Sequence, residues 1–385
     1  MKKVFALTLA VMMVVAMFAG CGSSGASNED PTVVKIGTTG PLTGDYAAYG
    51  TAVEAGMKIA VEEINALGGL QFAFDAEDDE GDGEKAVAGY NTLKDWGMDI
   101  FAGSVTSGAA AAVAAEAVID QMFVLTPSAS AVEVANAGPN VFQMCFTDPN
   151  QGASAAELMS VKWPGATIAV IYDSSDAYSA GIYNGFMAKA NELGLKIVVE
   201  TSFTKDSNTD LSTQVAECKN ANAEIVFLPI YYTEASRILN SANDIGYAPT
   251  FFGCDGMDGI LTIEGFDPAM AEGLVLMTPF DANASDAATQ AFVAKYKEQN
   301  NGQVPNQFAA DGYDVIYALY AALTAAGLDG TASHEEICEA LVQWFTTNNG
   351  FDGLTGKGMT WDESGMISKL PAAVVINNGV YVPMK

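Results

Sequence analysis

Hydroxyl, phenol and carboxyl groups follow short apolar runs at several places in the sequence. Ser107 and Ser128 come after DIFAGSVT and MFVLTP, and Tyr231 and Asp255 come after EIVFLPI and PTFFGC. Hydroxyl and backbone N–H groups can bind a carboxylate, and a buried carboxylate can pair with an ammonium group. Tyrosines can flank an apolar group while bonding through their hydroxyls. This set of groups is suited to binding a zwitterion such as an amino acid.

Cationic groups are missing from these positions. The single arginine, Arg237, lies within a predicted helix, where we expect a solvated residue. Without arginine, a second ligand carboxylate would have no strong partner, which favours neutral amino acids over aspartate and glutamate. The same serines could be only helix N-caps, and Asp255 could be only a turn residue.

Motifs for catalysis and metal binding are weak. The only histidine, His334, follows a predicted N-cap at Ser333, and no GxSxG motif accompanies it. An acid-pair glycosidase remains an open alternative. The acidic run DAEDDEGDGE places Gly89 where a calcium loop needs its bidentate glutamate, so we expect a loop that caps the next helix. We therefore expect no metal, no cofactor and no enzymatic activity.

Short apolar runs alternate with helical patterns in two series, over residues 33–128 and 167–256. The first helical pattern carries apolar residues at helical spacing, namely Val53, Met57, Ala60, Ile64 and Leu67, and ends at a glycine pair. The alternation predicts an α/β protein with two lobes, each a doubly wound parallel sheet. Ligands of such sheets bind beyond the carboxyl ends of the strands, where the polar residues above lie.

The N-terminal residues have the order of an export signal. A basic start precedes an apolar run and small residues that end at Cys21. The triplet before and at Cys21 resembles the lipobox of bacterial lipoproteins, which implies a diacylglycerol on this cysteine. We predict a signal peptide over residues 1–20, a lipidated Cys21 and a flexible tether over residues 21–31. An unmodified cysteine in a cleaved or retained leader is the alternative.

Charge and cysteine usage narrow the class further. The chain has 17 basic and 47 acidic residues, a formal charge of −30, which disfavours nucleic acid and adsorption to anionic lipid. We expect an extracytoplasmic protein that is attached to the outer face of the cell membrane by its lipid alone. The other cysteines, Cys145, Cys218, Cys254 and Cys338, match no metal pattern. Their even number would allow disulfides in an exported protein, but the sequence assigns no particular pairing.

Five loop motifs occur in a specific order. They are PLTGDYAAYG with its helix ending EEINALGG, DDEGDGEKAV, TPSASA, GCDGMDG and GLTGKGMTWDESGM. With them, the chain from about Val33 onward resembles the branched-chain amino acid (Leu/Ile/Val)-binding proteins, the substrate-binding lipoproteins of ABC importers. The resemblance implies a periplasmic-binding-protein type I fold, in which two lobes joined by three crossovers close over a ligand.

The resemblance also implies lobe boundaries. The three crossings fall near residues 146–148, near Pro279 and near residues 356–359. Lobe 1 is then residues 32–147 plus 279–356, and lobe 2 is residues 148–278 plus 357–385.

The resemblance also implies five ligand contacts, matched one position at a time. Ser107 matches the serine that bonds the ligand carboxylate, and Ser128 matches a residue whose carbonyl accepts from the ammonium. Ser130 stands where the family has a threonine that contacts the amino-acid head. Tyr231 matches a tyrosine of the cleft. Asp255 matches the acid that neutralises the ammonium, where well-known members have glutamate.

Three more cleft positions match, at Tyr49, Tyr178 and Asp148, the second of them after a one-residue insertion. The resemblance implies a monomeric solute-binding protein that captures a neutral amino acid, branched-chain or otherwise aliphatic, and delivers it to an ABC permease. Alternatives are a small amide, urea or aromatic-acid ligand, or a sensory binding module. We favour transport because the sequence contains no second transmembrane or signalling segment.

Overall fold

We describe a computed structural model of the protein over residues 30–384. The predicted signal peptide and Cys21 lie outside the described residues. Residues from Thr32 onward form one compact unit. In the described range, no helix combines the length and apolar character needed to cross a membrane.

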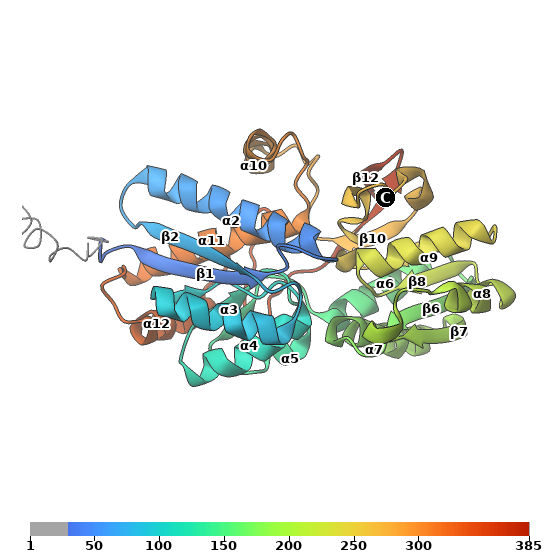
Figure 1. Ribbon diagram of the computed structural model, residues 1–385, viewed down its shortest axis with the longest axis horizontal. Helices are drawn as coiled ribbons and strands as arrows, with labels where there is room; N and C mark the ends of the chain where they lie inside the picture. The colour runs from blue at the N-terminus through green and yellow to red at the C-terminus, as the bar shows by residue number, and fades with distance from the viewer. Residues whose placement is uncertain (1–29, 385) are drawn as a thin grey trace, which may run out of the picture. The chain divides into compact units, whose positions relative to one another are not determined.

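The first sheet has five parallel strands in the order β2-β1-β3-β4-β5. They are β1 (Val34–Gly40), β2 (Phe72–Asp78), β3 (Ile100–Phe101), β4 (Val124–Thr126) and β5 (Val141–Gln143). Figure 1 shows β1 and β2 of this sheet side by side. The helices of this part are α2 (Ala47–Leu67), α3 (Gly83–Trp96), α4 (Ser107–Ile119), α5 (Val132–Ala135), α10 (Ala287–Gln299), α11 (Gln307–Ala326) and α12 (His334–Thr347). We call this sheet with these helices the first lobe.

The second sheet has seven strands in the order β12-β11-β10-β9-β8-β6-β7. Its parallel strands are β6 (Thr167–Asp173), β7 (Lys196–Phe203), β8 (Ile225–Leu228), β9 (Thr250–Gly253) and β10 (Val275–Thr278). Two antiparallel strands, β11 (Ala372–Asn377) and β12 (Val380–Pro383), extend one edge of the sheet. This sheet is therefore mixed, whereas the sequence predicts a parallel sheet. A short hairpin turn joins β11 and β12, which permits antiparallel pairing without a crossover helix.

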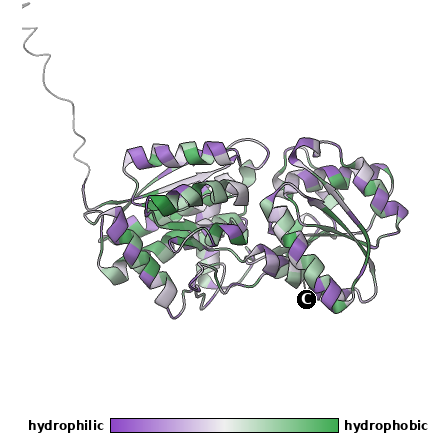
Figure 2. Cartoon of the chain, turned by 90° about the horizontal axis from the view of Figure 1, so that it is seen from below, coloured by the Kyte–Doolittle hydropathy of each residue, from purple (hydrophilic) through white to green (hydrophobic). Residues whose placement is uncertain are grey.

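The second lobe consists of this sheet and its helices. The helices are α6 (Asp148–Lys162), α7 (Ala177–Leu193), α8 (Ser212–Asn220) and α9 (Tyr232–Asp244). Four short 3₁₀ turns complete it: η1 (Lys205–Ser207), η2 (Asp255–Met257), η3 (Ile260–Thr262) and η4 (Pro268–Ala271). The two-lobed α/β class predicted from the sequence is confirmed, with helices on the sheet faces and apolar residues concentrated on the strands (Figure 2).

The local sequence explains where α2 buries its apolar face and where it ends. In α2, Val53, Met57, Ala60 and Ile64 are buried at helical spacing, and Gly68, with φ 71°, ends the helix. Leu67 was expected on the same face but is 65% exposed, because it lies in the last turn beyond the edge of the core.

Helices α6 and α7 pack with their backbones in contact. A Cβ atom at Gly152 would lie 2.3 Å from the carbonyl oxygen of Ile182, and one at Gly185 would lie 2.6 Å from Cα of Pro149. Only glycine fits at such an approach. The two helices therefore form a single rigid pair directly after the predicted first crossing.

The predicted third crossing needs revision. Trp361 Nε1 donates to the carbonyl oxygen of Gln143 at 2.7 Å, and Lys369 Nζ lies 2.8 Å from the carboxylate of Asp311 on α11. Residues 359–369 thus pack on the first lobe, and the chain enters the second sheet only at Ala372. We propose that this crossing lies near Leu370, after the expected residues 356–359, because these buried contacts hold the segment on the first lobe.

Candidate functional site

Six of the residues singled out from the sequence line one pocket, which we call the inner pocket. From the first lobe come Tyr49 on α2, Ser107 at the start of α4 and Ser128 after β4; from the second come Tyr178 on α7, Tyr231 before α9 and Asp255 after β9. Val105, Thr106, Gly256 and Phe308 complete the lining. The pocket lies at the carboxyl ends of strands from both sheets, as parallel α/β topology predicts.

Asp255 is the acidic group of the inner pocket. Its carboxylate accepts from Tyr178 Oη at 2.7 Å and from Gly256 N–H at 2.8 Å, and its own N–H donates to Gln151 Oε1 at 3.1 Å. Burial raises the pKa of this carboxyl to about 6, while the hydrogen bonds from Tyr178 and its neighbours oppose the rise. A desolvated carboxylate with few donors is well suited to pair with a ligand ammonium.

Hydroxyl groups and a helix end form the opposite side of the inner pocket. Ser107 is the first residue of α4, where unpaired backbone N–H groups and the helix dipole favour a negative group. Its Oγ accepts from the N–H of Ala131 at 3.2 Å, which leaves its own proton for a second acceptor. Ser128 Oγ donates to the carbonyl of Val105 at 2.8 Å, so its hydroxyl is already engaged.

Aromatic rings form the wall between these two ends. Tyr178 and Tyr231 stack at 4.8 Å with 7° between their planes, and Tyr49 lies 4.5 Å from the ring of Phe308. Tyr49 Oη also donates to the carbonyl of Gly256, which joins α2 of the first lobe to the second lobe. The rings offer an apolar surface with polar tips.

Ser130 and Asp148 do not line the inner pocket. They are adjacent, because Asp148 N–H donates to the carbonyl of Ser130 at 3.0 Å, and both are buried. Burial raises the pKa of Asp148 well above its usual range. Within residues 30–384, neither its carboxylate oxygens nor Ser130 Oγ have a hydrogen-bond partner. Ligand contact by these two residues stays a prediction.

Several residues at the site were not anticipated. Phe308 and Gln307 open α11, and Gln307 Nε2 donates to the carbonyl of Asp255 at 2.9 Å. The sequence does contain a signal for the start of α11, because Asn306 follows a proline and is a residue type that often caps helices. Tyr231 is the N-cap of α9 and Tyr232 is its first residue, so both side chains lie at the helix start that faces the first lobe.

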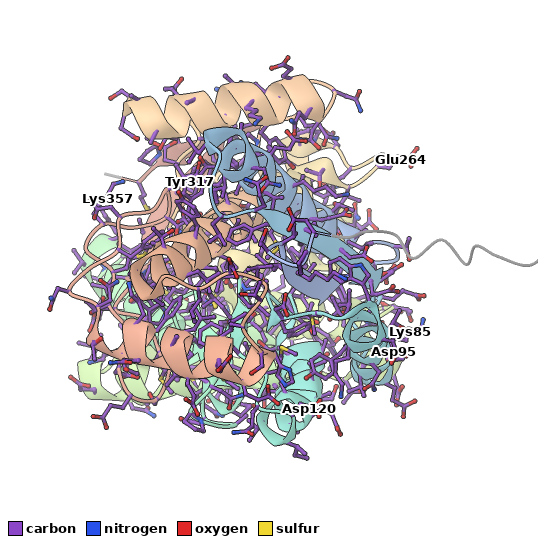
Figure 3. The ribbon with its side chains drawn as sticks, turned by 90° about the vertical axis from the view of Figure 1, so that its left-hand side faces the viewer. Lys85, Asp95, Asp120, Glu264, Tyr317 and Lys357 are labelled. Carbon is purple, nitrogen blue, oxygen red and sulfur yellow. The ribbon has the colours of Figure 1, made fainter. Side chains whose placement is uncertain are left out.

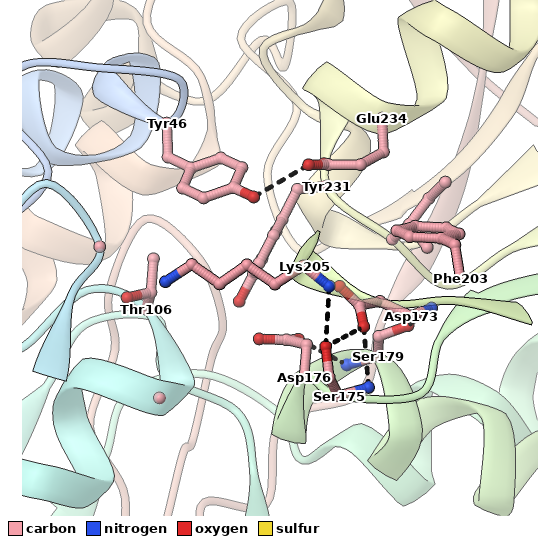
Figure 4. A pocket seen from close by; sticks show the side chains of 13 residues that line it. Tyr46, Thr106, Asp173, Ser175, Asp176, Ser179, Phe203, Lys205, Tyr231 and Glu234 are labelled. Atoms are coloured by element: carbon pink, nitrogen blue, oxygen red, sulfur yellow. Dashed lines mark hydrogen bonds between the residues drawn. The ribbon is translucent and has the colours of Figure 1, made fainter. Parts of the chain in front are cut away.

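A larger pocket adjoins the inner one, and we call it the outer pocket (Figure 4). It shares Thr106 and Tyr231 with the inner pocket. Its other lining residues include Tyr46 from the first lobe and Asp173, Asp176, Phe203, Lys205, Ile230 and Glu234 from the second. The sequence predicts strand ends without basic groups, but Lys205 lines the outer pocket.

Other candidate residues have structural roles. Ser333 caps α12 through a capping box, as expected, and His334 Nε2 lies 3.1 Å from the carbonyl oxygen of Asp120, a surface residue labelled in Figure 3. Asp82 caps α3, which confirms the capping role of the acidic loop. No cluster of potential metal ligands occurs among the described residues. Arg237 lies on α9 with its side chain 28% exposed, and its guanidinium also donates to the carbonyl of Asn208 at 3.1 Å, so the residue is only partly solvated.

The four cysteines of the described part are buried and free, namely Cys145, Cys218, Cys254 and Cys338.

Comparison with known proteins agrees with this fold. The family model described as "Periplasmic binding protein" matches residues 33–379. A Leu/Ile/Val-binding protein homolog from Brucella melitensis is 29% identical, over 83% of this chain and 86% of its own length. The Leu/Ile/Val-binding protein of Escherichia coli is 27% identical, over 91% of this chain and 92% of its own length.

Solved structures give the same result. A leucine-binding protein from Thermotoga maritima superposes with a TM-score of 0.82 at 27% identity, covering 92% of this chain and 98% of its own. A branched-chain amino acid transporter substrate-binding protein from Streptococcus pneumoniae, in complex with isoleucine, gives 0.81 at 26% identity, covering 91% and 97%. A binding protein from Rhodopseudomonas palustris in complex with benzoate shares the fold at 20% identity.

The chain belongs to the periplasmic binding protein family, with the type I fold. Its relatives are extracytoplasmic solute-binding proteins, and those named above include branched-chain amino acid-binding components of transporters.

Proposed function

We propose that this protein is a non-enzymatic, extracytoplasmic solute-binding protein that captures an amino acid between its two lobes and delivers it to an ABC permease. The observation that carries the proposal is the arrangement of the inner pocket. The carboxylate of Asp255 and the helix start at Ser107 belong to opposite lobes and line the same pocket. These two ends match the ammonium and carboxylate of an amino acid.

The names of the relatives support an amino acid and point to leucine, isoleucine and valine as reference ligands. An aromatic acid, urea or a simple amide lacks the α-ammonium group. Such a ligand would leave the buried carboxylate of Asp255 without a cation, which is costly for a desolvated charge. The inner pocket therefore supports an amino acid over these alternatives.

We further propose that diacylated Cys21 attaches the protein to the outer face of the membrane and that residues 21–31 act as a tether. One acyl chain gives only marginal membrane attachment, and two give stable anchoring. We propose that the protein works as a monomer, because both halves of the inner pocket come from one chain.

A thermal-shift screen of the protein without residues 1–20 tests the function. The panel contains the twenty amino acids, common amides, urea and benzoate. A ligand at 100 times its Kd should add about 2.7 kcal/mol to the free energy of unfolding. The proposal fails if no amino acid raises the melting temperature and an amide or aromatic acid does.

A further inference from the structure

The outer pocket is polar where an aliphatic side chain would need an apolar surface. Three carboxylates line it, from Asp173, Asp176 and Glu234, against one ammonium group, from Lys205. Figure 4 shows the Lys205 side chain extending across the pocket toward Thr106. A purely aliphatic group placed here would take these carboxylates out of water and return no hydrogen bond.

Glu234 is the most buried of these acids, with 3% of its surface exposed. Its Oε1 accepts from Tyr46 Oη at 3.0 Å and from Asn208 Nδ2 at 2.9 Å, and Arg237 Nη1 lies 3.8 Å from it. Its Oε2 is buried and has no hydrogen-bond partner within the described residues. A buried carboxylate oxygen without a donor is costly, so a donor from the ligand would be favoured.

The two other acids are partly used within the protein. Asp176 Oδ1 accepts from the N–H of Ser179 at 2.9 Å as the N-cap of α7, and Asp173 Oδ1 accepts from both the N–H and the hydroxyl of Ser175. Both remain part of the pocket lining, so three carboxylates line the pocket with one ammonium group. The excess of carboxylates over cationic groups in the lining of the outer pocket therefore favours a ligand group rich in N–H.

We propose that the ligand is an amino acid whose side chain ends in an N–H donor, either an amide or an ammonium group, and that Glu234 accepts from it. This inference rests on the proposed function. The inner pocket binds the α-amino and α-carboxyl groups. The side chain then passes Thr106 and Tyr231, which both pockets share, and enters the outer pocket. The preference differs from the aliphatic ligands in the relatives' names.

Calorimetric titration of the wild-type protein tests the preference. The amide arm uses glutamine and asparagine, the cationic arm uses lysine and arginine, and the aliphatic arm uses leucine, isoleucine, valine and norleucine. Glutamate forms an acidic arm. We expect the best N–H ligand to bind at least about tenfold tighter than the best aliphatic one. Tightest binding by an aliphatic amino acid, or by glutamate through Lys205, would overturn the inference.

The variant Glu234→Gln tests the acceptor. It keeps the size of the side chain and removes the charge. We expect it to weaken the best N–H ligand by about tenfold or more and norleucine by less than about threefold. The matched control is Glu200→Gln, whose carboxylate accepts from Tyr183 Oη at 2.6 Å on the surface of the same lobe and should not change either affinity. Equal weakening of all ligands by Glu234→Gln would mean a structural role and would overturn the inference.

These outcomes separate the inference from the proposed function. Aliphatic preference with binding that still depends on Asp255 overturns the inference alone. Binding of no amino acid from any arm overturns the proposed function, and the inference with it.

Discussion

Tyr178 Oη lies 2.7 Å from Asp255 Oδ1 and also accepts from the N–H of Gly256 at 2.9 Å. The phenol therefore fixes the position of the carboxylate that lines the inner pocket, and its ring at the same time stacks on Tyr231. Tyr178 therefore both positions Asp255, which we expect to contact the ligand ammonium, and supplies a ring that we expect to pack on the ligand.

The variant Asp255→Asn should bind amino acids much more weakly, because it keeps the shape of the side chain and removes the charge. Neutralising one partner of a desolvated ion pair costs about 2–5 kcal/mol, or about thirty-fold to several-thousand-fold in Kd. The melting temperature without ligand should not fall, since the buried charge no longer has to be desolvated. Calorimetric titration and thermal unfolding measure both effects. Binding within about threefold of wild type would contradict the role of Asp255.

Amino-acid affinity should depend on pH near the pKa of Asp255. Burial raises this pKa to about 6, so the free protein takes up a proton below that pH and must release it to bind an ammonium. Affinity should weaken as pH falls below about 6, by up to about tenfold per pH unit, and stay level above it. Titrations at several pH values test this. The control is Asp258→Asn, because Asp258 has a pKa raised to about 6 by burial but does not line the inner pocket. The Asp258→Asn variant should keep the full decrease of affinity below pH 6, and the Asp255→Asn variant should lose this decrease.

The same raised pKa predicts a trend for the protein without ligand. Between about pH 4, where the unfolded carboxyl titrates, and pH 6, the folded protein binds more protons than the unfolded chain. The contribution of Asp255 to the free energy of unfolding should therefore decrease as pH rises through this window.

Contacts between the lobes should contribute to ligand affinity. The N–H of Ala48 on α2 donates to Tyr232 Oη at 3.2 Å on the second lobe. The variant Tyr232→Phe removes this bond, which is worth about 0.5–1.5 kcal/mol, and should weaken binding accordingly by favouring separated lobes. Tyr247→Phe is the matched control, because Tyr247 Oη donates to the carbonyl of Ala223 within the second lobe. Small-angle scattering should show a smaller radius of gyration with ligand for wild type, and an unchanged profile would argue against closure.

The buried ion pair of Lys369 and Asp311 should stabilise the segment before the third crossing. Both side chains are almost fully buried, and Lys369 Nζ also donates to Thr355 Oγ1 at 2.6 Å. Lys369→Met leaves Asp311 without its cation and should cost about 3–5 kcal/mol in the free energy of unfolding. Burial already raises the pKa of Asp311 to about 7 against the effect of Lys369, so the loss should be greater at pH 8 than at pH 6.

Denaturant titration of two further variants gives the contrast. The double variant Lys369→Met/Asp311→Leu should regain much of the loss, because no buried charge remains. Lys58→Met removes an exposed pair with Glu54 and should cost less than about 1 kcal/mol. Similar losses of unfolding free energy in all three variants would show that the effect comes from packing and not from the buried charge.

Cys21→Ala should release the protein from the cell surface without changing its ligand affinity. The reason is that the proposed diacylglycerol supplies the attachment and the pockets lie far along the chain. Fractionation of cells into membrane and medium, with binding assays on the released protein, measures both. A variant that stays on the membrane would contradict the lipid anchor.

Strand and helix order could be predicted from the sequence because apolar periodicity is local. Ser107, Tyr178 and Asp255 could be located because each lies in the first two residues of a helical turn that follows a strand. Phe308 could not, since α11 reaches the inner pocket through tertiary packing alone. Lys205 lies on a 3₁₀ turn, and its side chain reaches the outer pocket by its length and not by its position in a motif.

The backbone contact between α6 and α7 has a consequence for how the ligand is captured. Gln151 on α6 and Tyr178 on α7 both bond to Asp255 or its backbone, and Gly152 and Gly185 allow the two helices to pack with their backbones in contact. All three groups therefore turn as one body with the second lobe. A bound amino acid should therefore meet these groups through one rotation of the second lobe, and not through three separate side-chain rearrangements.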